Sequence, residues 1–165
     1  MVTVISDAGP LISLAEIGCF ELLRALFAKV YIPKAVYTEV VIVGEGRPGA
    51  QEVREAIQEG WLEVVQAKES STLALLRVDL DDGEAEALAL ATAFKASLLL
   101  MDERKGRIRA KAMGLSCIGT VGILLLARET GVTLDLQALL DDLRSKGFRI
   151  SDALYEHILR EAQKL

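Results

Sequence analysis

Two aspartates follow apolar runs of the kind that form buried strands. Asp7 ends the run VTVIS, and Asp102 comes directly after SLLLM. The carboxyl ends of parallel strands meet at one edge of a sheet, so the two side chains would emerge close together if these runs were neighbouring strands. Two carboxylates held side by side repel each other unless a cation neutralises them. Either aspartate alone is ordinary in a loop, whereas the pair is suggestive of a metal site.

A third acid, Glu39, lies within the helix predicted from Pro33 to about Val43. It interrupts an apolar stripe that contains Val36 and Val40 and ends at Val43. A carboxylate at the solvated edge of a helix explains the same pattern. From the residues alone, that second interpretation is the favoured one.

A further pair of acids stands in the segment Asp82-Gly83-Glu84-Ala85-Glu86, at the start of an alanine-rich helix. Glu84 and Glu86 are two residues apart, so they point to nearly opposite sides of that helix and cannot both face one site. The segment is apolar almost all round, and its periodicity therefore does not choose between them. Favourable charge at a helix N-terminus is the alternative explanation for both.

The segment after Asp102 is the most basic part of the chain. Five of the eight residues from 104 to 111 are basic: Arg104, Lys105, Arg107, Arg109 and Lys111. Such groups could bind the phosphates of a nucleic acid without reading its sequence. A solvated helix face explains the run equally well, and Arg107 could instead pair with the acids.

Short apolar strands alternate with helices along the whole chain, and this alternation must position the acids. It predicts an α/β fold in which a mainly parallel sheet carries helices on both faces. We expect Asp82 to cap the alanine-rich helix. The predicted strands cover residues 2–5, 30–32, 61–65, 97–101 and 116–118, and the predicted helices cover 11–16, 19–29, 33–43, 48–59, 70–80, 82–95, 105–113, 120–131, 135–146 and 151–164.

The composition restricts the class of protein. A length of 165 residues fits one domain, and 52% hydrophobic residues exclude a disordered chain. Aromatic residues make up 5% of the chain and the net charge is -5, so neither a base-stacking surface nor a broadly basic coat for nucleic acid is expected. The chain begins without a signal-peptide pattern and has no apolar run long enough to cross a membrane. We therefore predict a cytoplasmic protein with no membrane partner.

Four other residues with chemically useful side chains receive structural interpretations. Cys19 and Cys117 stand far apart among apolar neighbours, so we expect free, reduced thiols. His157 is the only histidine, which makes a histidine-based metal site and a catalytic role improbable. Trp61 is expected to pack against the core.

The order and spacing of five segments resemble a PIN domain, over nearly the whole chain. The similarity is strongest to small prokaryotic PIN-like proteins related to the VapC-type toxins of toxin–antitoxin pairs. It implies a three-layer α/β/α fold and a single domain over residues 1–165 that includes two C-terminal helices at about 135–165. The segments are SDAGPLISLAEIG, VYIPKAVYTEVV, LDDGEAEALALA, LLLMDERKGRIRAKAMGLSCIGTVGILLLA and GFRISDALYEHILREA.

The resemblance implies roles for four acids as catalytic residues and metal ligands. Asp7, Glu39, Glu84 and Asp102 match the family's acids in that order, which leaves Glu86 as the weaker candidate. Oxygen ligands without histidine or cysteine suit a hard cation, and Mg²⁺ or Mn²⁺ is expected.

The sequence departs from the family pattern after the first acid. Ala8 stands where a threonine or serine hydroxyl commonly follows, and Ser6 or Thr120 could replace that group. Glu103, beside Asp102, could be an outer ligand or simply exposed.

The activity implied by the resemblance is Mg²⁺- or Mn²⁺-dependent hydrolysis of RNA by an endoribonuclease. Arg104, Lys105, Arg107 and Arg109 would bind the substrate. The family also implies a homodimer, and an antitoxin partner if the protein is the toxin of such a pair. The alternative function is a catalytically weak PIN-like module that acts by binding protein or RNA.

Overall fold

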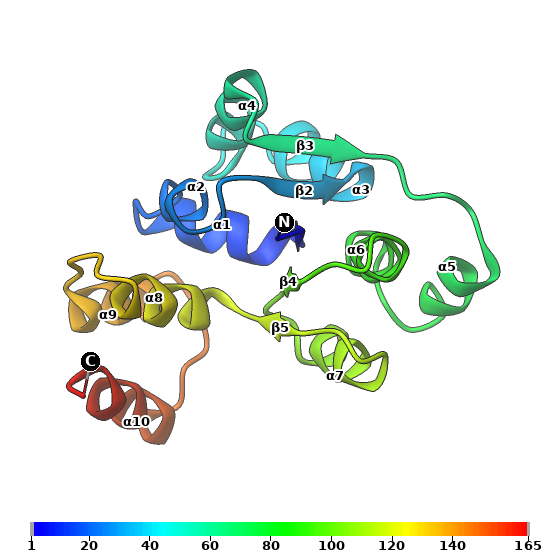
Figure 1. Ribbon diagram of the computed structural model, residues 1–165. Coiled ribbons are helices and arrows are strands. Elements are labelled where there is room, and N and C mark those ends of the chain that lie inside the picture. The colour runs from blue at the N-terminus through cyan, green and yellow to red at the C-terminus, as the bar shows by residue number, and fades with distance from the viewer. Residues whose placement is uncertain (1, 165) are drawn as a thin grey trace.

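The computed structural model describes residues 2–164 and contains a five-stranded parallel sheet (Figure 1). Met1 and Leu165, the two ends of the predicted domain, lie outside the described residues. The strand order is β3-β2-β1-β4-β5, so the first strand lies at the centre. The predicted α/β architecture is confirmed. The strands are β1 (Val4–Ser6), β2 (Val30–Pro33), β3 (Leu62–Val65), β4 (Leu98–Leu100) and β5 (Cys117–Ile118).

The central strands are apolar on both sides because helices cover both faces of the sheet. Successive residues of a strand point to opposite faces, and Val4 and Ile5 accordingly enter two different cores. Leu99 and Leu100 on the neighbouring strand divide in the same way. All four side chains are fully buried, so a continuous apolar run rather than an alternating one encodes these strands.

The helices form two layers, and Figure 1 shows them on opposite sides of the sheet. The layer of α1, α2, α4, α8, α9 and α10 encloses the larger core, whereas α5, α6 and α7 enclose the smaller one. The helices are α1 (Ala8–Glu16), α2 (Leu22–Phe27), α3 (Lys34–Tyr37), the π-helix η1 (Thr38–Val43), α4 (Ala50–Glu59), α5 (Ser71–Leu76), α6 (Asp82–Ala93), α7 (Arg104–Ala112), α8 (Thr120–Glu129), α9 (Leu136–Ser145) and α10 (Asp152–Ala162).

The helix predicted over residues 33–43 differs from the observed structure. Pro33 is extended, at φ -71° and ψ 157°, and ends β2 instead of opening a helix. From Thr38 the chain is a π-helix, and the Gly44 N–H donates to the Glu39 carbonyl at 3.0 Å, a step of five residues. The wider turn exposes Val43 to 75%, so its predicted place in the buried stripe is wrong.

Two further boundaries depend on capping. The helix predicted over residues 70–80 is shorter, because Ser70 caps α5 and the helix ends at Leu76. Asp81, and not Asp82, caps α6, since its carboxylate accepts the Glu84 N–H at 2.8 Å.

Three other predictions concern the core and the membrane. Trp61 is buried against Phe20, with ring centroids 5.6 Å apart, as expected. Cys19 and Cys117 are free and half-buried. Across the described residues, 2–164, every helix is too short or too polar to cross a membrane.

Candidate functional site

The sheet places Asp7 and Asp102 at the carboxyl ends of adjacent strands. Ser6 pairs with Leu100 in the parallel register of β1 and β4. The Asp7 N–H then donates to the Leu100 carbonyl at 2.9 Å, which extends the pairing one residue past the strand. The two runs are therefore neighbouring parallel strands, which was the condition for the two acids to emerge at one edge.

Among the acids of this region, Asp7 has the most strongly shifted pKa. Its side chain is 6% exposed, and burial is the main reason that its pKa is raised to about 7. The charges of Asp81, Glu84 and Glu39 raise the pKa further, while the Ala8 N–H lowers it. Three acidic side chains from two other elements therefore act on the carboxyl group that ends β1.

Glu84 is the second buried acid of this region. It is 8% exposed, and its pKa is raised to about 7, first by burial and then by the charge of Asp81. Asp81 is a fifth acid that the sequence analysis did not select. Its spacing from Glu84, three residues across a helix start, is the capping-box pattern and could have identified it.

Glu39 approaches the same acids from the π-helix. It is exposed, yet partial burial of its carboxyl group and the charge of Asp81 raise its pKa. Glu39 and Asp81 line one pocket. The π-helical turn thus presents Glu39 towards the start of α6, and a π-turn often occurs where a functional residue is positioned.

Glu86 points elsewhere, which agrees with the predicted geometry of the pair. Its carboxylate accepts the Ala35 N–H at 3.2 Å and lies 3.4 Å from Nη2 of Arg77. It joins α6 to α3, and it also lines the pocket that contains Glu39 and Asp81. The structure therefore separates Glu84 from Glu86.

Asp102 is held by hydrogen bonds from a single residue. The Thr120 N–H donates to Oδ1 and the Thr120 hydroxyl donates to Oδ2, each at 2.7 Å. Burial raises the pKa of Asp102, whereas the Thr120 hydrogen bonds and the charge of Arg107 lower it. Of the two hydroxyls considered as replacements, Thr120 thus contacts an acid of the site.

Ser6 and Glu103 occupy different positions around these acids. The Ser6 hydroxyl donates to the main-chain carbonyl of Asp7 at 2.9 Å and not to a carboxylate. Glu103 is exposed, but its charge raises the pKa of both Asp102 and Glu84. Glu103 therefore lies near the space between these two acids.

Glycines keep the space next to the aspartates open. A Cβ atom at Gly83 would lie 3.2 Å from Oδ1 of Asp7, and one at Gly119 would lie only 2.5 Å from Oδ1 of Asp102. A Cβ at Gly9 would lie 3.2 Å from Oδ2 of Asp102. A larger residue at any of these positions would press on a carboxylate.

The donor chemistry of this region fits a hard divalent cation. Its acids offer only carboxylate oxygens, and their mutual repulsion would be offset by a bound cation. In the part of the chain that the structure describes, no three His, Cys, Asp or Glu side chains converge closely enough to hold a metal ion. The acids therefore lie near one another, but their carboxylate oxygens are not close enough to coordinate one ion.

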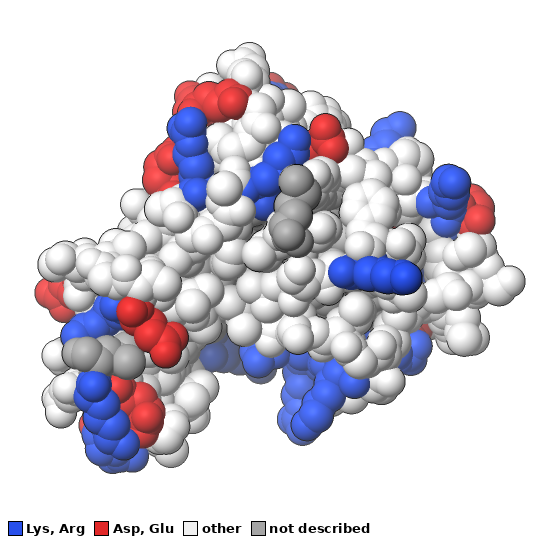
Figure 2. All heavy atoms as spheres, in the orientation of Figure 1, with Lys and Arg blue, Asp and Glu red and all other residues white. Residues whose placement is uncertain are grey.

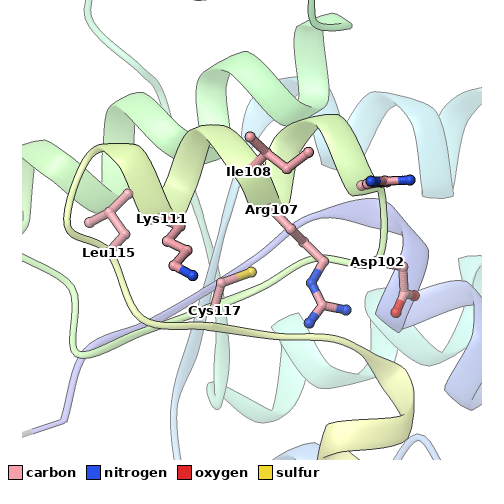
Figure 3. A pocket seen from close by; sticks show the side chains of 7 residues that line it. Asp102, Arg107, Ile108, Lys111, Leu115 and Cys117 are labelled. Carbon is pink, nitrogen blue, oxygen red and sulfur yellow. The ribbon is translucent and has the colours of Figure 1, made fainter. Parts of the chain in front are cut away.

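The basic segment divides between two sides of α7. Figure 2 shows Lys and Arg side chains gathered along the lower edge of the molecule, over α7. Arg107 and Lys111 point to the same side, where Asp102 stands beside Arg107 (Figure 3). This side borders the α7 pocket, which is lined by Asp102, Arg104, Arg107, Ile108, Lys111, Leu115 and Cys117.

The other two predicted substrate-binding residues lie outside the α7 pocket. Arg109 forms an ion pair with Asp79 at 3.0 Å, and Lys105 is exposed. His157, for which no role was expected, lines a second pocket that also includes Asp102. His157 lies 55 residues after Asp102 in the chain, and only the tertiary structure brings the two residues to one pocket.

Comparisons with known proteins agree with the geometry. The family described as DUF3368, PIN domain, matches residues 3–164. Among solved structures, a PilT N-terminus domain protein from the hyperthermophilic archaeon Sulfolobus solfataricus P2 is similar, with a TM-score of 0.52 and 20% identity, over 75% of this chain and 91% of that chain. At this identity the likeness concerns the fold alone. No curated protein matches the chain by sequence.

Proposed function

The chain belongs to the PIN domain family, whose members are generally nuclease-like and use divalent metals, and from this premise we propose that it is a metal-dependent nuclease that hydrolyses RNA. The observation that carries the proposal is the electrostatics of the acids. Burial is the main cause that raises the pKa values of Asp7 and Glu84 to about 7, and the charges of neighbouring carboxyl groups raise them further. Repulsion of this kind supports a site whose charge is completed by a cation.

The residues that would hold Mg²⁺ or Mn²⁺ are Asp7, Asp102, Glu39 and Glu84, with Asp81 beside them. The chemistry that such a cation supplies when bound is activation of a water molecule and neutralisation of phosphate charge. Toxicity within a toxin–antitoxin pair, an antitoxin partner and a homodimer belong to the same proposal. Their support is the resemblance to VapC-type proteins.

The chain's own residues perform three tasks around the reacting phosphate. Asp7 and Glu84 release their protons near neutral pH, so both become available as charged ligands at about pH 7 and above. Thr120 fixes the orientation of Asp102 through two hydrogen bonds. Arg107 adds positive charge next to Asp102, in a pocket that Arg104 and Lys111 also line.

Substitution of the most perturbed acid tests this function. We expect Asp7→Asn to lower Mn²⁺-dependent cleavage of a mixed RNA pool by about 100-fold or more, since a metal ligand is lost. Asp152→Asn is the matched control, because the side chain of Asp152 is 98% exposed on α10. Unchanged metal-dependent cleavage by the Asp7→Asn protein would remove the basis of the proposal.

A second function, a catalytically weak binding module, is favoured by one observation. Ala8 carries no hydroxyl, and the Ser6 hydroxyl is bonded to the main chain; of the two candidate replacements only Thr120 contacts an acid, and that acid is Asp102 and not Asp7. Thermal stabilisation by Mn²⁺ without any RNA cleavage would support this module over the nuclease. Cleavage that needs Mn²⁺ and is lost with Asp7→Asn would exclude it.

A further inference from the structure

A second pocket adjoins Asp102 on the side of the C-terminal helix. It lies among β5, α8, α10 and the segment before α10, and its volume is about 400 Å³. We call it the α10 pocket. Its apolar wall includes Val121, Leu125, Phe148 and Leu154, and its polar wall consists of Asp102, Arg107, Arg149 and His157.

The α10 pocket and the α7 pocket adjoin each other. Both are lined by Asp102 and Arg107. Gly119 stands between these two side chains, since a Cβ atom there would be 2.5 Å from Oδ1 of Asp102 and 3.3 Å from Nη1 of Arg107. Because Gly119 carries no side chain, the path past Asp102 from one pocket to the other is not blocked at this position.

The arginines and the lysine that line the two pockets form no close ion pair among the described residues, although Arg107 lies near Asp102. Arg104, Lys111, Arg107 and Arg149 form no ion pair within residues 2–164, whereas Arg109, just outside, pairs with Asp79. In a chain with a net charge of -5, these four cations outnumber the one carboxylate, Asp102, that lines the same two pockets. Groups in this arrangement complement a chain of phosphates.

The apolar wall distinguishes the α10 pocket from a simple phosphate site. Leu154 is 46% exposed, although it lies on an amphipathic helix whose Ile158 is buried. Apolar side chains beside a histidine and an arginine suit a planar, polar-edged group such as a nucleobase. A volume of about 400 Å³ is at the lower end of the range for small-ligand pockets, which is appropriate for one nucleotide.

We propose that the α10 pocket binds one unstacked nucleotide of a single-stranded RNA, while the neighbouring part of the strand lies along the α7 pocket. The base would lie against Leu154 and Phe148, and the phosphates would contact Arg149 and Arg107. A duplex keeps its bases stacked and paired, so it cannot place a base here without an energetic cost. This inference rests on the proposed nuclease function and adds to it a base-binding pocket beside Asp102, formed by Phe148, Arg149 and Leu154.

The first test measures binding without cleavage. A short fluorescent RNA is titrated with the protein in the presence of a chelator, so that no divalent cation is available. We expect Arg149→Gln to weaken binding about five- to tenfold at low salt and to reduce the salt slope by about 1. Arg160→Gln is the control, because Arg160 is exposed on α10, the helix that follows Arg149, but does not line the pocket. Equal binding by the two variants would overturn the proposal.

The second test examines the base contact. Single abasic sites are moved along the same RNA, and we expect weaker binding at one position with the wild-type protein. In Leu154→Ala that position should lose its effect, because the apolar wall that contacts the base is reduced. Leu75→Ala, at a side chain 67% exposed on α5, is the control. A loss that is equal at every position, or equal binding of a duplex of the same length, would contradict a base pocket.

The outcomes separate this inference from the proposed function. If the wild-type protein cleaves RNA but Arg149→Gln and Leu154→Ala bind like their controls, the α10 pocket is not a nucleotide site and the nuclease remains. If no RNA is cleaved but the abasic pattern depends on Leu154, the nuclease falls and the nucleotide site stands. If RNA binds only through uniform electrostatic attraction, or if the pocket binds a partner other than nucleic acid, the affinity will not depend on the position of the abasic site. That result would refute the inference.

Discussion

The regions around Asp7 and Asp102 begin from the same sequence pattern, and burial raises the pKa of both aspartates, but different groups surround the two carboxylates. Each aspartate follows a buried strand, and the two strands are adjacent. Asp7 meets the charges of Asp81, Glu84 and Glu39, and its pKa is raised to about 7. Asp102 instead accepts two hydrogen bonds from Thr120 and lies near Arg107.

The difference arises from the helices that each region faces. The start of α6 and the π-helix bring acids towards Asp7. The start of α8 brings N–H and hydroxyl donors towards Asp102, and α7 brings cations. Carboxyl groups therefore surround the Asp7 side of this edge, whereas the Asp102 side also carries hydrogen-bond donors and cations.

The largest expected effect is on stability at the Asp7 side. Asp7 has a pKa raised from 3.8 to about 7, so in the folded protein its ionisation costs up to about 4 kcal/mol. Because the folded state holds this proton more tightly, the contribution of Asp7 to stability is lost as pH rises from about 4 to about 7. Asp7→Asn should be more stable than the wild type above that window, by about 2 kcal/mol in metal-free urea unfolding.

The control is the pH dependence of the difference in stability between Asp7→Asn and the wild type. Below the unfolded pKa of 3.8 both side chains are neutral in both states, and the two proteins should unfold alike. Asp102→Asn should show no comparable gain, since the Asp102 carboxylate already accepts two hydrogen bonds. If the Asp7→Asn protein is less stable than the wild type above pH 7, ionisation of Asp7 does not destabilise the folded protein, and the proposed difference between the two regions is wrong.

The next effect concerns the space beside each aspartate. Gly119→Ala would place Cβ only 2.5 Å from Oδ1 of Asp102, so the carboxylate must move and strain its bonds to Thr120. We expect a loss of about 1–3 kcal/mol in the free energy of unfolding. Gly83→Ala, with a 3.2 Å approach to Asp7 inside α6, should change stability much less, because alanine favours the helix. Equal losses would mean that the Asp102 region is as adaptable as the Asp7 region.

Metal binding should follow the titration of the acids on the Asp7 side. Asp7 and Glu84 must lose protons with pKa values of about 7 before they act as ligands. The affinity for Mn²⁺, measured by thermal shift or calorimetry, should rise up to about tenfold per pH unit for each proton released, and then level off above pH 7. An affinity independent of pH between about 5 and 8 would show that these two carboxyl groups are not ligands.

The smallest expected effects separate the two sides of α7. Arg109→Gln removes a partly exposed ion pair with Asp79 and should cost less than about 1 kcal/mol of stability, with little change in RNA binding. Arg107→Gln removes a charge that favours ionised Asp102, so it should cost a small amount of stability, and it should weaken RNA binding. The two variants are compared by urea unfolding and by titration of the fluorescent RNA. A reversed pattern would place the substrate on the Asp79 side.

Local patterns were sufficient for the parts of the fold that depend on neighbouring residues. The short apolar runs that end at Asp7 and Asp102 predicted two buried strands, and the structure shows that these strands are adjacent and parallel. The two-residue spacing of Glu84 and Glu86 predicted that they point apart, and Glu86 indeed binds Ala35 and Arg77 instead. The choice of Glu84 over Glu86 needed the resemblance to a family.

The sequence by itself determined the α/β fold and the strand ends that carry Asp7 and Asp102. Both follow from the pattern of apolar and polar residues within short segments of the chain. Only the tertiary structure decided that Asp81 joins the acids, that Arg109 turns to Asp79, and that Arg149 and His157 line a pocket with Asp102. These outcomes depend on how helices distant in the chain pack against one edge of the sheet. A carboxyl group's pKa and a cation's partner are set by that packing, since electrostatic interactions act through space between residues that no local pattern connects.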